Sequence, residues 1–226
     1  EKENAVSAAA VDASGNPQMK GDGGAARMCP ATELYQNKMR EVARTLAQDY
    51  PVDGTYFDLG GTRASTWCFS TEHGHPPGTG PMIVRGKREV MAGMREAARQ
   101  VNPEFALIME GNADCYATAV DGYCLFEENV PARQALYHDY VRPGGCKRCV
   151  LEKAPFEALN PAKHFAWGTV IGRFGGKELA RNPFQGTELS PEKVGYFKQL
   201  VDHKWVARPW LNYGTLLRPL TLTDIS

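Results

Sequence analysis

The sequence lacks three features that would assign it to common classes of protein. It has 26 basic and 26 acidic side chains, and this balance gives no field for capturing nucleic acid or an anionic membrane. No run of about 18 apolar residues is present, so no segment is predicted to span a bilayer. The glycine-rich piece at 172–176 lacks the Gly-Lys-Ser/Thr ending of a phosphate loop, which disfavours nucleotide chemistry.

The sequence also lacks internal repeats and low-complexity linkers, so a single domain is the default expectation. Residues 1–28 are rich in Ala, Gly, Ser, Asn and Asp without a periodic apolar pattern, which predicts an extended or loop-like segment. The domain is expected to occupy residues 29–226. The sequence does not begin with a basic region followed by an apolar stretch, so no signal peptide is predicted; a mature or truncated chain would look the same.

The sequence has six cysteines. An even number allows all of them to pair in disulfides, but it is equally compatible with free thiols. Cys146 and Cys149 form a close pair, but neither a second such pair nor nearby histidines occur at the usual zinc spacing. Three interpretations stay open: disulfides or a partly oxidised set, buried free thiols, and a metal or redox role. The first is favoured, and it predicts an extracellular or cell-surface location.

Helix and strand patterns alternate along the middle of the chain. Apolar residues recur at helical spacing from Thr32 until Pro51, and again over residues 90–101. A further helix is predicted from Ser190 to about Trp205. Short apolar runs predict strands at 54–59, 105–110, 121–126 and 135–140. This alternation indicates βαβ units and a parallel sheet.

Two of the predicted strands end in an acid that precedes glycine. The run VDGTYFDLGG delivers Asp58, and the run FALIMEG delivers Glu110. In parallel α/β architectures, ligands bind at the carboxyl ends of the strands. The pair therefore predicts a two-acid active site. Asp53 and Asp121 precede glycine at the opposite ends of their strands and are expected to form turns.

A connection of roughly 25 residues follows the first acid, over about 60–84. It is several times the usual length of such a loop, and long loops are mostly lids or binding loops. His73 and His75 flank Gly74 there, which fits a tight loop that points both imidazoles one way. We consider sugar-hydroxyl donation, metal binding beside an acid such as Asp58, and plain loop packing for these histidines.

Several sequence runs together carry a family resemblance: VDGTYFDLGG, CFSTEHGHPPGTG, ALIMEG, VDGYCLF, VPARQALYHDY and RPWLNYGTLLRPL. They resemble the catalytic barrel of a glycoside-hydrolase-like family, domain of unknown function 6259, whose members resemble (β/α)8 glycosidases. The resemblance covers about residues 29–220 and implies an α/β, TIM-barrel-like fold with parallel strands and long βα loops. A complete barrel takes about 250 residues. The resemblance therefore implies a partial barrel, its C-terminal part, with early strands missing or supplied by other segments or chains.

The resemblance also gives roles to individual residues. By analogy with alpha-amylase-like barrels, Asp58 is the nucleophile and Glu110 the acid/base of a retaining pair; the alternative is that either acid caps a helix or pairs with an arginine. Aromatic faces stack on sugar rings, although filling the core is an equally good use for them. The candidates for substrate binding are Tyr56, Trp67, His73, His75, Tyr116 and Asp139.

The sequence thus predicts a hydrolase of glycosidic bonds that acts on a carbohydrate without a cofactor or metal. Neither a nucleic-acid partner nor a membrane span is expected, whereas other chains or segments are expected to complete the barrel. One alternative is a non-catalytic structural or carbohydrate-binding component of an extracellular assembly. Another is a metal-dependent hydrolase built on His73, His75 and Asp58.

Overall fold

The computed structural model describes residues 2–20, 25–58, 60, 67–78, 80–111, 113–124, 132–144, 162, 164–170 and 191–214. The chain divides into two compact units, Glu1–Gly122 and Tyr123–Ser226. In chain order, the elements of the first unit are α1 (Lys2–Ser7), β1 (Met19–Lys20), β2 (Ala25–Ala26), α2 (Glu33–Asp49), β3 (Gly54–Phe57), α3 (Pro81–Arg99), β4 (Ala106–Glu110) and η1 (Asp114–Tyr116). Strand β5 (Gly122–Cys124) begins at its last residue, and α4 (Ala132–Tyr137), β6 (Arg142–Gly144) and α7 (Pro191–Tyr213) belong to the second unit.

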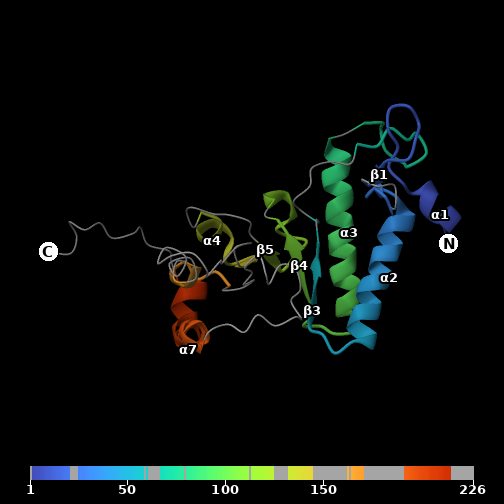
Figure 1. Ribbon diagram of the computed structural model, residues 1–226. Helices are drawn as coiled ribbons and strands as arrows, with labels where there is room; N and C mark the ends of the chain where they lie inside the picture. Colours follow the sequence, from blue (N-terminus) through green and yellow to red (C-terminus); the bar gives the residue numbers. More distant parts are fainter. Residues whose placement is uncertain are drawn as a thin grey trace. The chain divides into compact units, whose positions relative to one another are not determined.

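Helix α2 forms where the sequence predicts it, whereas α3 begins at Pro81, nine residues before the start predicted at residue 90. Thr32 is the N-cap of α2, and the helix ends at Asp49, just before Pro51. Pro81 occupies the first turn of α3, where its missing N–H costs no hydrogen bond. The two helices lie side by side (Figure 1), and α3 also contacts β4. The long connection after β3 therefore ends at Gly80, somewhat earlier than predicted.

Strands β3 and β4 are parallel neighbours, as the alternation of helix and strand predicts. Leu107 and Met109 of β4 are completely buried, and each such side chain contributes about 1.5–3 kcal/mol to folding. Tyr56 and Ile108 are partners in the strand register, and both are exposed. One face of the pair is thus packed and the other is open. The described residues form a mixed α/β structure with parallel strands and no closed barrel.

The N-terminal segment is more ordered than the loop predicted for residues 1–28. It contains α1 and the antiparallel pair β1–β2. The N–H of Ala10 donates to the carbonyl of Arg27 at 2.7 Å, and the N–H of Gln18 donates to the carbonyl of Ala10 at 2.8 Å. Because this segment shares one compact unit with everything up to Gly122, the structure places no boundary after residue 28.

Asp121, which was expected to form a turn, supports the start of the sheet through its side chain. One carboxylate oxygen accepts the N–H of Leu107 at 2.9 Å, and the other accepts a hydrogen bond from Arg99 at 2.9 Å. Arg95 also lies within ion-pair distance of it, at 3.5 Å. This acid therefore joins α3 to the amino-terminal end of the strands.

In the second unit, a helix replaces one of the predicted strands. Residues 135–140 were expected to form a strand, and that prediction is wrong: α4 covers Ala132–Tyr137, and a turn follows it. The local sequence Ala-Arg-Gln-Ala-Leu favours helix through residues of high helix propensity, whereas the apparent alternation leaves Leu136 and Tyr140 exposed. Apolar alternation over six residues therefore did not reflect burial.

Helix α7 begins at Pro191 as predicted but continues to Tyr213, past the expected end at about Trp205. Its last turns are held by Arg142, which donates to the carbonyl of Asn212 at 3.1 Å and lies 4.6 Å above the Tyr213 ring. No helix among the residues described is long and apolar enough to cross a membrane.

Candidate functional site

The two predicted catalytic acids lie at the same edge of the β3–β4 pair. The strand register joins Gly54 to Ala106 and Phe57 to Met109. Asp58 follows Phe57 directly and Glu110 is the last residue of β4, so the register continued by one residue sets Asp58 beside Glu110. Neighbouring strands are about 4.8 Å apart. The register agrees with the prediction that the two strands are adjacent, and the use of the two acids as one catalytic pair stays a prediction.

The two acids differ in their surroundings. Glu110 is only 5% exposed, whereas Asp58 is an exposed residue in the turn after β3. That turn is tight, since the N–H of Gly60 donates to the carbonyl of Phe57 at 3.3 Å. The edge therefore carries one enclosed carboxyl group and one that faces solvent.

The three aromatic residues that were predicted to bind substrate differ in their exposure to solvent. Tyr56 and Trp67 are exposed, and Tyr56 lies on the open face of β3, two residues before Asp58. Tyr116, in contrast, is buried in η1, and this burial together with the neighbouring Cys115 raises the pKa of its hydroxyl to about 12. Tyr116 therefore packs in the core, while Tyr56 and Trp67 present accessible rings.

Asp139 belongs to the second unit. It was predicted near the end of a strand, but it lies in the turn after α4. Its carboxylate is exposed, 3.4 Å from Nε2 of His138. Its proposed part in substrate binding stays a prediction.

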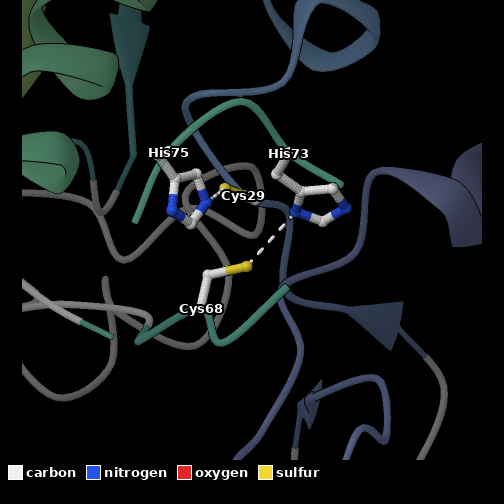
Figure 2. A group of neighbouring side chains, drawn as sticks. All are labelled: Cys29, Cys68, His73 and His75. Atoms are coloured by element: carbon white, nitrogen blue, oxygen red, sulfur yellow. Dashed lines mark hydrogen bonds between the residues drawn. The ribbon is translucent and has the colours of Figure 1, made fainter. Parts of the chain in front are cut away.

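His73 and His75 have partners other than those the sequence suggested. Nδ1 of His73 lies 3.2 Å from Sγ of Cys68, and Nε2 of His75 lies 3.3 Å from Sγ of Cys29. One ligand-type atom from each of the four side chains falls within 4.8 Å of the other three. Figure 2 shows the two imidazoles and the two thiols facing a common centre. We call these four residues the Cys–His cluster.

The other ring nitrogen of each histidine is also engaged. Nε2 of His73 is 2.8 Å from the carbonyl oxygen of Ser7, and Nδ1 of His75 is 2.8 Å from the carbonyl oxygen of Pro76. A carbonyl can only accept, so each of these nitrogens carries the proton. Both nitrogens of both rings are thus used within the protein, and this arrangement does not favour the predicted donation to sugar hydroxyls.

The two thiols lie in an apolar shell. Cys29 and Cys68 are completely buried, together with Ala10, and Ala31 and Met82 pack against them. Burial raises the pKa of the Cys29 thiol to about 12, although N–H groups of the adjacent backbone oppose the shift. Without a compensating positive charge, the neutral thiol is favoured there.

The described cysteines form no disulfide. Cys29, Cys68, Cys115 and Cys124 are all free thiols, so the expectation of disulfides gains no support from them. Cys146 and Cys149 lie outside the described residues. The sequence analysis missed the cluster because it compared the spacing with that of short zinc motifs, and Cys29 comes from a segment 39 positions before Cys68. The signal that was available is the grouping of Cys68, His73 and His75 within eight residues.

Comparison with known proteins finds two relatives that carry the name putative glycoside hydrolase. The chain is 30% identical over 93 residues to a protein of Bacteroides thetaiotaomicron named "Putative glycoside hydrolase", a match that covers 41% of this chain and 14% of that protein. It is 28% identical over 142 residues to "Putative glycoside hydrolase 22789" of Monosiga brevicollis, covering 58% of this chain and 12% of that protein. The chain thus matches only a small part of the length of these relatives.

A family model covers more of the sequence. The model named Domain of unknown function (DUF6259) matches residues 1–146 of the 226 in the chain. The matched region includes both strand-end acids and all four residues of the Cys–His cluster. The chain therefore belongs to the family of domain of unknown function 6259.

Proposed function

We propose that this chain supplies the two catalytic acids of a glycoside hydrolase that acts on a carbohydrate substrate. The observation that carries the proposal is the β3–β4 register, which pairs Phe57 with Met109 and makes Asp58 and Glu110 the next residues of the two chain segments. Retaining glycosidases need their two carboxyl groups about 5–5.5 Å apart, close to the spacing of about 4.8 Å between neighbouring strands. The names of the two distant relatives are consistent with this chemistry.

The proposed reaction proceeds in two steps. In the first, the Glu110 carboxyl group protonates the glycosidic oxygen while the Asp58 carboxylate attacks the anomeric carbon, which releases the leaving alcohol and forms a glycosyl ester. In the second, Glu110 takes a proton from water, the water oxygen attacks the anomeric carbon, and the ester bond to Asp58 breaks. Two displacements at one carbon retain its configuration. Both acids end in their starting protonation states.

The open face of the strand pair supports the proposal that this site belongs to a larger barrel. Tyr56 and Ile108 are exposed on that face, whereas the interior of a (β/α)8 barrel is filled with side chains. We propose that segments outside the described residues cover this face and complete the barrel. Trp67, which lies in the connection after β3 and not on this face, then keeps an accessible aromatic ring for stacking on sugar.

The proposed location is extracellular or at the cell surface. It rests on the even number of cysteines in the sequence. Fractionation of cells that express the full-length protein, followed by blotting of medium, surface and cytosol, tests it. Recovery of the protein in the cytosol alone would exclude this location.

The catalytic proposal is tested in the full-length protein with activated aryl glycosides. Asp58→Ala and Glu110→Ala are expected to lose turnover, and azide distinguishes their roles. In the nucleophile variant, azide attacks the substrate once and gives a glycosyl azide of inverted configuration. In the acid/base variant, azide attacks the glycosyl ester and gives the retained product. Asp53→Asn is the matched control, because Asp53 is an exposed aspartate at the other end of β3.

Three outcomes would contradict the proposal in different ways. Unchanged turnover in both variants would remove Asp58 and Glu110 from the mechanism. If azide gave the retained product with the Asp58 variant and the inverted product with the Glu110 variant, Glu110 would be the nucleophile and Asp58 the acid/base. Binding to a glycan array without any product by mass spectrometry would favour the non-catalytic alternative.

A further inference from the structure

We propose that Cys29, Cys68, His73 and His75 form a structural zinc site. No part of this inference depends on the proposed hydrolase activity, since neither Asp58 nor Glu110 belongs to the cluster. Two thiolates with two imidazoles are a ligand set that favours tetrahedral zinc. Four protein ligands also leave no open position for water, which is the mark of a structural site as opposed to a catalytic one.

The distances in the cluster are close to those of a coordination tetrahedron. With zinc–sulfur bonds of about 2.3 Å and zinc–nitrogen bonds of about 2.0–2.1 Å, adjacent ligand atoms are about 3.4–3.8 Å apart. The Cys68–His73 and Cys29–His75 contacts are 3.2 and 3.3 Å, and all four ligand atoms lie within 4.8 Å of one another. Small movements of the side chains therefore suffice to admit the ion.

The hydrogen bonds of the histidines prepare them for metal binding. The protons on Nε2 of His73 and Nδ1 of His75 are directed to the carbonyls of Ser7 and Pro76. The lone pairs of His73 Nδ1 and His75 Nε2 consequently face the thiols (Figure 2). Metal-bound histidines almost always donate their second N–H to a carbonyl, carboxylate or water in this way.

The local backbone supports the same arrangement. The N–H and carbonyl of Cys68 pair with the carbonyl and N–H of Gly78, at 3.0 and 2.7 Å, which closes the loop that carries both histidines. Gly74 lies between the histidines with φ of 70°, a conformation that glycine adopts without steric cost. The sequence thus allows a sharp turn that aims both rings at one centre.

A zinc ion here would join segments that are distant in sequence. Cys29 is anchored to the N-terminal segment through its N–H, which donates to the carbonyl of Ala8 at 2.8 Å. Cys68 and the histidines come from the connection between β3 and α3. The ion would therefore fasten the N-terminal segment to the loop that follows Asp58. Its role is to stabilise that loop at the carboxyl end of β3.

The alternative to a zinc site is a disulfide bond between Cys29 and Cys68, and the experiments below distinguish the two. The full chain, purified without chelators and incubated with zinc under reducing conditions, is expected to hold one zinc ion per molecule by elemental analysis. X-ray absorption at the zinc edge should give two sulfur neighbours at about 2.3 Å and two nitrogen neighbours at about 2.0–2.1 Å. No bound zinc, or a coordination shell without sulfur, would overturn the proposal.

Variants distinguish this site from other thiols and imidazoles. Cys68→Ser and His73→Gln are expected to lose the zinc, whereas Cys115→Ser and His203→Gln keep it, because those two side chains lie outside the cluster.

A thiol-labelling experiment on the unmodified chain covers the case in which the cluster variants fail to fold. In partly denaturing urea, chelation should speed the reaction of the buried Cys29 and Cys68 with iodoacetamide, while the exposed Cys115 reacts at the same rate with or without chelator. A mass two hydrogens lower, with labelling of Cys29 and Cys68 that requires reductant, would identify the disulfide and exclude the zinc site.

Discussion

The Cys–His cluster and the pair of strand-end acids both lie in the first unit, yet they are constructed differently. Every side chain of the cluster has its partners within the described residues, and the two thiols are fully buried. The acids are aligned by the register of two strands, and Asp58 is exposed beside the open face that carries Tyr56 and Ile108. The cluster thus has all its contacts among the described residues, whereas the edge of the sheet that carries Asp58 and Glu110 is still open to solvent.

This difference shows how the two sites depend on the rest of the protein. A closed cluster of four side chains holds its geometry through its own contacts. An active site also needs walls that exclude water and bind substrate, and in barrel enzymes these walls come from several different βα loops. We therefore expect the cluster to be functional in this chain, and the acids to be functional where further segments cover the sheet.

Loss of the proposed metal has the largest expected effect. Structural zinc contributes about 10–16 kcal/mol of apparent binding free energy in zinc-finger peptides. The double variant Cys29→Ser, Cys68→Ser should therefore release residues 2–20 and 67–78, while α2 and α3 stay packed together. Hydrogen–deuterium exchange with mass spectrometry measures this directly. Uniform protection before and after the substitutions would mean that the cluster does not hold these segments.

Loss of either acid is expected to have the next largest effect. Glu110→Gln removes a proton donor, and general acid–base groups contribute about 10²–10⁴-fold to rate. Asp58→Asn should reduce turnover at least as much, because it removes the attacking group. Steady-state kinetics of the full-length protein measure both changes. The melting temperature of Asp58→Asn should stay close to that of the parent, since Asp58 is exposed; a large loss of stability would indicate a structural acid.

Elements set by local signals could be predicted from the sequence. Helix α2 begins directly after Thr32 and ends before Pro51, at the positions that these residue types mark in the sequence, although the Thr32 hydroxyl donates to the carbonyl of Cys29 and does not cap the helix. Asp58 and Glu110 could be identified as neighbours because parallel strands present their carboxyl ends at one edge. Residues 135–140 could not be assigned in this way, because a six-residue apolar alternation does not distinguish a strand from the exposed helix that formed.

The cluster could be predicted only in part. The sequence places Cys68, His73 and His75 close together. Cys29 joins them through tertiary contacts: its N–H donates to the carbonyl of Ala8, and the adjacent Pro30 packs against Gly86 of α3. Such a contact depends on tertiary structure and has no characteristic spacing. The tautomers of both histidines likewise depend on carbonyls, those of Ser7 and Pro76, that only the folded chain identifies.

A smaller effect is expected from the helix that packs against Cys29. A Cβ atom at Gly86 of α3 would lie 2.7 Å from the backbone of Pro30, which forces the adjacent Cys29 to move. Overpacking of this kind costs about 1–3 kcal/mol. Gly86→Ala should therefore lower both the free energy of unfolding and the zinc affinity, measured by denaturant titration and by competition with a chromogenic chelator.

The helical Gly195 provides the matched control for Gly86. A Cβ atom at Gly195 would meet nothing within 4 Å, so Gly195→Ala should stabilise the chain by about 0.4–1 kcal/mol without a change in zinc affinity. If Gly86→Ala behaved in the same way as Gly195→Ala, the close approach of α3 to Pro30 would not position the cluster.

The smallest expected effect concerns the open face of the sheet. Ile108 is 40% exposed and Leu107, its neighbour in β4, is 1% exposed. In this chain, Ile108→Thr should change the free energy of unfolding by no more than about 0.5 kcal/mol, whereas Leu107→Ala should cost about 2–5 kcal/mol. Chemical denaturation measures both. A cost for Ile108→Thr that approached that of Leu107→Ala would mean that this face is already covered, and the acid edge would then be as complete as the cluster.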